Sequence, residues 1–200
     1  IRLAGTIGSP EFGGDVSLSG GRYENLDVGS ILVNLSAQSR ISSDGAFAVD
    51  LNGEDGAGGD VSAVASVADG RVEATINANS ATLVRRDDVT AAVSLDLTAA
   101  GPLDAPDIAG QITIDRAEVR LVNATPPGVA DIGDVRIKGQ ERPEPEKASG
   151  EDIDLDITIK GPQDIFVRGR GLDSEWKIDL KISGTAADPR IVGVVEKRRG

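Results

Sequence analysis

The 200-residue sequence predicts an almost entirely β chain, and three observations support this fold class. Apolar and polar residues alternate strictly in "IDLDITIK" at 153–160 and "KIDLKIS" at 177–183, which is the period of a strand with one dry and one wet face. Turn-forming sequences such as "SSDG", "VADG" and "TPPG" separate the alternating stretches. The 3.6-residue period of an amphipathic helix is hard to find along the chain. We therefore expect an antiparallel-rich sheet.

Taken in order, the predicted strands begin with "DVSLS" at 15–19. Between 60 and 67 the side chains are too small to separate strand from helix, although nearby Gly, Asn and Ser favour strands and turns. Clear alternation resumes at "AVSLDLT" (92–98), "QITID" (111–115) and "EVRLV" (118–122). At about 10 to 12 residues per strand with its turn and about 4.8 Å per strand, the chain would form a ribbon roughly 80 to 100 Å long.

A Gly–Pro–Gly pattern recurs three times. Gly5, Pro10 and Gly14 have the same spacing as the equivalent residues of "GPLDAPDIAG" (101–110) and "GTAADPRIVG" (184–193). We interpret each copy as a strand that ends at the first glycine, a tight connection containing proline, and a new strand that begins near the second glycine.

Residues 139–152 ("GQERPEPEKASGED") are different in kind, because they hold few apolar residues and two prolines that disfavour strand pairing. They predict a flexible exposed loop. The remainder of residues 1–200 is expected to form one continuous curled sheet. The sequence starts at Ile1 and is strongly patterned to both ends, so we interpret it as an excerpt of a longer chain, with any signal or anchor outside it.

The composition disfavours the common kinds of catalysis and nucleic-acid binding. The chain has no histidine and no cysteine, so the usual general base and the strongest nucleophile are missing. Its 21 basic and 33 acidic residues give a net charge of -12, which repels nucleic-acid phosphates. We predict a protein that is not an enzyme, with no catalytic residue, no cofactor and no nucleic-acid partner.

Two charged features have both a functional and a plain interpretation. Asp154 and Asp156 share one strand face and could hold a hard cation, but Lys160 and Lys181 belong to the same polar sets. That mixture favours a solvated face and no metal site. The two arginines of "VRGRG" at 167–171 could hold an anion, although charges that protect an edge strand are the favoured explanation.

The apolar face of the alternating strands is the candidate site. A second sheet, the same sheet curled upon itself, or an apolar guest could cover it. Tandem β-sandwiches are the alternative fold, but sandwiches use bulky core residues, whereas aromatic residues make up only 2% of this chain. We predict an open hydrophobic groove, lined by Val93, Leu95, Leu97, Ile112, Ile114, Ile153, Leu155, Ile157, Ile159, Ile178, Leu180 and Ile182.

Three long stretches of the sequence, at 8–32, 79–130 and 153–193, resemble the C-terminal domain of the TamB family, which is similar to the AsmA-like and bridge-like lipid transfer proteins. The most specific parts are "GGRYEN" (20–25), "RRDDVTA" (85–91), "QITIDRAEVRL" (111–121) and "IFVRGRGLDSEW" (165–176). The resemblance covers nearly the whole chain.

The resemblance implies a long curled sheet that is open along one side, a β-taco with a hydrophobic groove. It implies the periplasmic part of an inner-membrane-anchored protein in the Gram-negative cell envelope, which meets the outer-membrane barrel protein TamA in the translocation and assembly module. The family is associated with outer membrane biogenesis, through the assembly of outer-membrane proteins such as secreted autotransporters and through phospholipid transport between the two membranes.

The residues leave three functions open. The apolar face could conduct phospholipid acyl chains, whose burial contributes about 0.8 kcal/mol per CH₂. The same face, or an exposed edge, could receive strands of nascent outer-membrane proteins. A secreted or surface adhesin module, whose apolar face is a closed core, is the alternative. The last predicted strand, 191–195, precedes basic residues and is a candidate contact for a protein partner.

Overall fold

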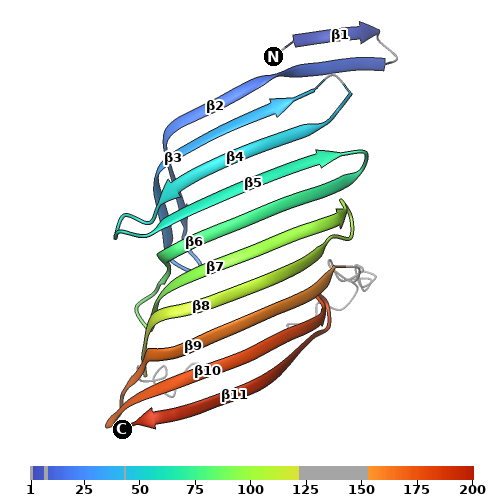
Figure 1. Cartoon of the computed structure of the whole chain (residues 1–200). Helices are drawn as coiled ribbons and strands as arrows, with labels where there is room; N and C mark the ends of the chain where they lie inside the picture. The colour runs from blue at the N-terminus through green and yellow to red at the C-terminus, as the bar shows by residue number, and fades with distance from the viewer. Residues whose placement is uncertain (1, 7–8, 43, 122–152) are drawn as a thin grey trace, which may run out of the picture.

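The computed structural model describes residues 2–6, 9–42, 44–121 and 153–200 and shows one open sheet of eleven strands in chain order (Figure 1). The strands are β1 (Arg2–Thr6), β2 (Ser9–Asn25), β3 (Ser30–Ile41), β4 (Phe47–Glu54), β5 (Asp60–Ala68), β6 (Arg71–Arg85), β7 (Val89–Pro102), β8 (Asp107–Arg120), β9 (Asp154–Gly169), β10 (Leu172–Thr185) and β11 (Pro189–Arg199). Neighbouring strands are antiparallel except β8 and β9, which are parallel. The predicted all-β, antiparallel-rich sheet is confirmed. Within the described ranges, the protein has no helix of the length and apolarity that a membrane span requires.

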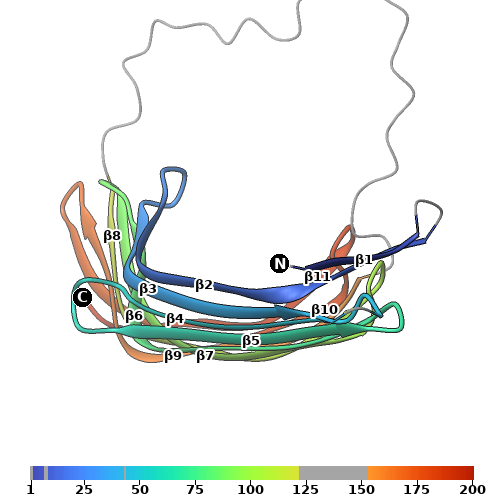
Figure 2. The ribbon, with the colours of Figure 1, turned by 90° about the horizontal axis from the view of Figure 1, so that it is seen from above.

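The sheet is curled, with a long floor and an upturned side (Figure 2). Neighbouring strands carry irregularities of register, for example between Ala78 and Ala81 in β6 and between Thr113 and Ala117 in β8. Ser80, inside the first of these, has a φ of 45°. An extra residue in one strand bends the strand and increases its twist, so this series of irregularities accounts for the bend.

The buried core is a small set of residues near these irregularities. The buried hydrophobic residues among those described are Leu35, Ala78, Ala81, Ala117 and Ile165. Glycines on the neighbouring strands make room for the larger ones, since a Cβ on Gly53 would lie 2.6 Å from Leu35 Cδ2. Because the described residues form a single sheet, no second layer of them covers the rest of the apolar face.

A contact between strands that are not neighbours closes one corner of the curl. The backbone N–H of Arg85, at the end of β6, donates to the carbonyl of Val28 in the β2–β3 turn (2.9 Å). Arg86 Nη1 donates to the carbonyl of Asp27 (3.3 Å). Gly29, with a φ of 70°, lies so close to the Arg85 carbonyl that a Cβ would overlap it. The β2–β3 turn is thus tied to β6 across the intervening strands β4 and β5.

Three expectations about the architecture are corrected or resolved here. Tandem sandwiches are wrong, because the described residues form one sheet. The prediction of about 10 to 12 residues per strand with its turn is also wrong, because β2 has 17 residues and β9 has 16. The stretches that begin at 111 and 118, predicted as separate strands, belong to the single bent strand β8. Eleven strands at about 4.8 Å span about 50 Å, not 80 to 100.

The undecided segment 60–67 is strand β5, whereas the loop predicted at 139–152 lies outside the described residues.

The three Gly–Pro–Gly copies are hairpin junctions, as predicted, but each new strand begins within one residue of the proline, and the second glycine lies inside that strand. They connect β1 to β2, β7 to β8 and β10 to β11. The second glycine has a φ of 149° at Gly14, 144° at Gly110 and 154° at Gly193. At Gly110 a Cβ would overlap the carbonyl oxygen of Asp96 in the preceding strand, so close approach of two backbones explains why glycine stands there.

Substitution of Gly110 by alanine is expected to destabilise the sheet by about 1 to 3 kcal/mol, because alanine must adopt a disfavoured φ and push the Asp96 carbonyl away. Urea unfolding followed by circular dichroism measures the loss. Gln111→Ala, at the exposed neighbouring position, is the control and should change the free energy of unfolding by less than about 0.5 kcal/mol. Equal effects of the two substitutions would contradict the close-approach explanation.

Candidate functional site

The register of the sheet places the predicted site residues on one face. Residues directly opposite each other in neighbouring strands point to the same side, and alternate residues of one strand do so too. One row across β7 to β10 consists of Leu95, Ile112, Ile159 and Leu180. A second consists of Leu97, Gly110, Ile157 and Ile182. By alternation, this face also holds Val93, Ile114, Ile153, Leu155 and Ile178.

The second row extends much further than the predicted residues. Read through consecutive strand pairs from β2 to β11, it is Leu18, Ala37, Leu51, Ala63, Ile76, Leu97, Gly110, Ile157, Ile182 and Ile191. We call the face that carries this row and the twelve predicted residues the apolar lane. Sequence reasoning missed its N-terminal half, where alanine and valine alternate with small polar residues; the alternation in "FAVDLNGE" (47–54) was the available signal.

The apolar lane is neither sealed nor fully exposed. All twelve predicted residues are half-buried. Towards the N-terminal strands the lane is more open, with Leu18 50% and Ile76 42% exposed. Aliphatic side chains that remain in contact with water along a whole face form a continuous apolar surface, larger than the scattered exposed residues of an ordinary surface.

The sheet bends towards the apolar lane. Ala78 lies in register between Val61 and Leu95 of the lane face and is 2% exposed. Side chains on the inside of a bend are crowded by their neighbours, whereas side chains on the outside are spread apart. The burial of Ala78, and of Ile165 further along the bend, therefore assigns the apolar lane to the concave side seen in Figure 2.

The opposite face carries most of the charged and polar side chains of the strands. Asp156 and Lys181 lie on it and form an ion pair of 2.9 Å, with both side chains more than half exposed. This solvated pair supports the plain interpretation of the aspartates on β9. The described residues contain no group of three or more acidic side chains placed to hold a metal ion.

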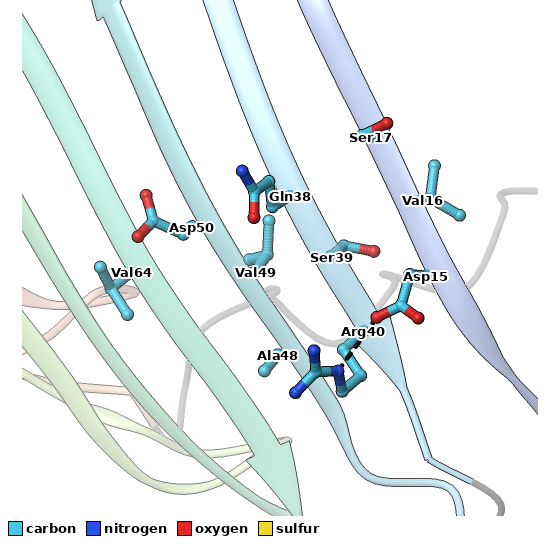
Figure 3. Close-up of a pocket in the computed structure, with 10 residues that line it drawn as sticks. All are labelled: Asp15, Val16, Ser17, Gln38, Ser39, Arg40, Ala48, Val49, Asp50 and Val64. Atoms are coloured by element: carbon cyan, nitrogen blue, oxygen red, sulfur yellow. Dashed lines mark hydrogen bonds and ion pairs between the residues drawn. The ribbon is translucent and has the colours of Figure 1, made fainter.

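A shallow depression of about 330 Å³ lies over β2 to β5 (Figure 3). Gln38 and Asp50 line it together with Val64, which is 55% exposed. Arg40 Nε donates to Asp15 Oδ1 (3.0 Å) at its side. Gln38, Asp50 and Val64 belong to the face opposite the apolar lane, whereas Val16 and Val49, which also line the depression, alternate with Leu18 and Leu51 of the lane.

A buried carboxylate fixes the bend on the lane side of β4 and β6. Asp55, with an exposed fraction of 0%, accepts hydrogen bonds from the backbone N–H groups of Ala57 (2.7 Å), Gly59 (2.8 Å) and Thr82 (2.8 Å). Arg85 Nη2 donates to the Asp55 carbonyl (2.6 Å) and carboxylate (3.2 Å). Burial alone would raise the pKa of Asp55, but the backbone donors outweigh it and hold that pKa well below its usual value. The sequence signalled a turn here, not a buried ion pair.

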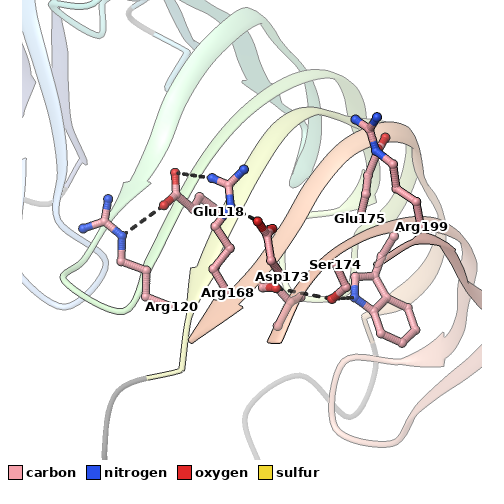
Figure 4. A network of polar contacts seen from close by, with 9 residues as sticks. Glu118, Arg120, Arg168, Asp173, Ser174, Glu175 and Arg199 are labelled. Carbon is pink, nitrogen blue, oxygen red and sulfur yellow. Dashed lines mark hydrogen bonds and ion pairs between the residues drawn. The ribbon is translucent and has the colours of Figure 1, made fainter. Parts of the chain in front are cut away.

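Charged residues at one end of β8, β9 and β10 form a network (Figure 4). Glu118 pairs with Arg120 (3.1 Å) and with Arg168 (3.7 Å), and Arg168 pairs with Asp173 (3.1 Å). The Arg168 guanidinium also lies 4.5 Å from the centre of the Phe166 ring. The predicted edge-strand role of "VRGRG" is wrong, because β9 is paired on both sides. Its Arg168 pairs with residues of the neighbouring strands β8 and β10 instead.

Glu175 holds the end of β11. Its carboxylate is buried, pairs with Arg198 (2.9 Å) and Arg199 (2.5 Å), and accepts a hydrogen bond from the N–H of Asp164 (3.3 Å). Burial alone would raise the pKa of Glu175, but the Asp164 N–H and the two guanidinium groups lower it below its ordinary value. The ionised form is therefore the one that fits the folded structure.

Replacing Glu175 by alanine is expected to loosen β11, because Arg198 and Arg199 lose their common partner. Hydrogen exchange of the β11 amides should become about tenfold faster. Since the pKa of Glu175 is lowered on folding, the protection that it gives is complete above its ordinary pKa and is lost as the pH falls below it. Glu196→Ala, which removes a weak exposed pair of 3.9 Å with Lys177, is the control; equal exchange rates in both variants would rule out this role.

The outer strand β11 is apolar on both of its faces. Ile191, Val192, Val194 and Val195 are 61%, 62%, 54% and 53% exposed. The strand pairs with β10 on one side, and on its other side no strand lies among the described residues. An edge strand without charges along its middle is a template for another strand.

Comparison with known proteins places the chain in a family. The model of the TamB C-terminal domain family matches residues 50–200, which is more than half of the chain. No curated protein and no solved structure matches. Strands β2 and β3 precede the matched residues and continue the same sheet. The chain therefore belongs to the TamB C-terminal domain family, a family of Gram-negative envelope proteins of the translocation and assembly module.

Proposed function

We propose that the apolar lane carries phospholipid between the inner and outer membranes, a non-enzymatic role. The observation that carries this proposal is the row of apolar residues, with Gly110 among them, that runs from Leu18 in β2 to Ile191 in β11 and that the described residues leave half-buried or exposed. Each CH₂ of an acyl chain that leaves water for such a surface contributes about 0.8 kcal/mol. Because apolar contacts are non-directional, an acyl chain can pass from strand to strand without breaking specific bonds.

The row of the lane crosses the strands. It therefore runs from β2 to β11, which lets a bound acyl chain move from one side of the sheet to the other. The polar face opposite it, with its Asp156–Lys181 pair, suits an aqueous compartment such as the periplasm. In this proposal the chain is the periplasmic part of an inner-membrane-anchored protein, and the open sheet is one section of a bridge.

A second role, in the assembly of outer-membrane β-barrel proteins such as autotransporters, is favoured by a different observation. The apolar edge of β11 has backbone groups that no strand of the described residues pairs with, and such groups bind an added strand with little dependence on its sequence. We propose this edge as the contact with a TamA-like outer-membrane barrel protein or with a nascent client. The alternative of a secreted adhesin requires a closed core, for which the single sheet of the described residues provides no second layer.

The lipid proposal is tested with a photocrosslinking residue at Ile157 on the lane or at Thr158 on the polar face. The protein is expressed in the periplasm of a Gram-negative cell, irradiated, and analysed by mass spectrometry. We expect phospholipid adducts at position 157 and few at 158. Equal labelling at both positions, or none at 157 in a folded protein, would refute the proposal.

A further inference from the structure

The last hairpin of the sheet, β10–β11, repeats the hairpin β7–β8 in detail. Leu97 is paired with Gly110 in the first and Leu180 with Gly193 in the second. A Cβ on Gly110 would overlap the carbonyl oxygen of Asp96, and a Cβ on Gly193 would overlap that of Asp179, the residue before Leu180. The two turns also share a hydrogen bond of 3.1 Å, from Ala105 N–H to the Pro102 carbonyl and from Asp188 N–H to the Thr185 carbonyl. Strand β11 is therefore the structural equivalent of β8.

The edge of β8 that faces away from β7 shows what its equivalent on β11 can bind. β8 is joined there by the parallel strand β9, in which Leu155, Ile157 and Ile159 lie opposite Ile108, Gly110 and Ile112 respectively. A branched aliphatic side chain thus stands opposite the glycine. By the equivalence of the hairpins, Ile191, Gly193 and Val195 occupy the positions of Ile108, Gly110 and Ile112 on β11.

Both faces of β11 carry apolar residues, which favours a parallel neighbour over an antiparallel one. Ile191 continues the apolar lane from Ile182. Val192, by contrast, lies opposite Lys181 on the polar face and is 62% exposed, and Val194 lies opposite Asp179 and is 54% exposed. Strands with apolar residues on both faces are typical of parallel sheets in which both faces are buried.

We infer that the edge of β11 binds a strand of a separate protein chain in the parallel orientation, with a branched aliphatic side chain opposite Gly193 and further aliphatic side chains two residues to either side. This inference rests on the protein contact proposed above for β11 and adds the direction, register and sequence pattern of the bound strand. The first copy of the Gly–Pro–Gly pattern, in the β1–β2 hairpin, favours an antiparallel neighbour instead, because β2 pairs with β3 in that orientation. That pair, however, is joined by the short turn between Asn25 and Ser30, a connection that a separate chain does not have.

The chain has no cysteine, so orientation can be read from a disulfide. The probe is a synthetic peptide with the sequence of residues 153–160, which contains the pattern of β9. Val192→Cys is prepared in the full chain. One peptide carries cysteine in place of Asp156, which in the parallel register lies opposite Val192, as Asp156 lies opposite Ala109 in β8. The other carries cysteine in place of Thr158, which would lie opposite Val192 if the peptide bound antiparallel about the same centre. Thr98→Cys, exposed on the same face in the fully paired strand β7, is the control.

With oxidised and reduced glutathione present, we expect the Asp156→Cys peptide to crosslink to Val192→Cys at least tenfold more than the Thr158→Cys peptide, and neither to crosslink to Thr98→Cys. A peptide with Ile157→Asp should lose the crosslink. Preference for the Thr158→Cys peptide would overturn the parallel orientation while leaving β11 as a partner contact. Absence of any crosslink above the Thr98→Cys level would overturn the binding edge itself. Neither result bears on lipid labelling at Ile157, which tests the lane separately.

Discussion

Aspartate at both Leu155 and Leu180 is expected to reduce the phospholipid that co-purifies with the chain at least tenfold. The two side chains lie on the apolar lane in neighbouring strands. An acyl chain that covered both carboxylates would strip them of water, and an unpaired buried charge costs several kcal/mol. In the absence of lipid the carboxylates remain hydrated, because the lane is open. Mass spectrometry of lipids extracted from detergent-free preparations measures the change.

The matched control places the same two charges on the other face. Thr98 and Gln111 are exposed side chains of β7 and β8 on the polar face, and Thr98→Asp with Gln111→Asp should leave the lipid content unchanged. Urea unfolding of both double variants separates binding from folding. If the lane variant stays folded and retains the lipid of the unaltered chain, or if the control loses lipid equally, the lane is not the lipid-binding surface.

The two faces of the sheet could be predicted from the sequence because a strand has a period of two that survives any later bend. Ile153, Leu155, Ile157 and Ile159 must share one face wherever β9 lies. The register then brings Ile157 beside Ile182, which the sequence could only suggest. The predicted lane residues all lie on one half-buried face for this reason.

The bend could not be predicted, because bulges have a weak local signal. Asn34, Ser80 and Asp164 have φ values of 52°, 45° and 59° at or beside the irregularities, and small polar residues of this kind are equally common in turns. Without bulges, a stretch as long as "SPEFGGDVSLSGGRYEN" is most simply divided into two short strands. Reading it as one bent strand, β2, lowers the predicted number of strands by one.

Pairings between residues far apart in the chain could not be predicted from the sequence either. The parallel contact of β8 with β9 joins residues separated by the 122–152 segment, and no turn sequence announces it. The arginines of "VRGRG" were therefore assigned to an edge although β9 lies inside the sheet. Asp55 was missed for a related reason, since its partners Thr82 and Arg85 come from β6.

Asp55→Ala is expected to cost about 3 to 5 kcal/mol of the free energy of unfolding, the range found when one member of a buried ion pair is removed. The substitution leaves the N–H groups of Ala57, Gly59 and Thr82 without their acceptor and Arg85 without its carboxylate. Urea unfolding at neutral pH measures the loss. Asp60→Ala removes only an exposed hydrogen bond with Asn79 and should cost less than about 0.5 kcal/mol.

The pH dependence distinguishes the ionised carboxylate from a merely well-packed side chain. Folding lowers the pKa of Asp55 from its usual 3.8, so its stabilisation is complete well above that pH and decreases as the pH falls towards the lower pKa of the folded state. Asp55→Asn keeps the size of the side chain but cannot ionise. The difference in free energy of unfolding between the two proteins should be constant above about pH 5 and shrink below about pH 4. A difference that stays constant down to pH 2 would mean that shape, not charge, holds the β4–β5 loop on β6. The bend that turns the apolar lane inward would then depend on packing alone.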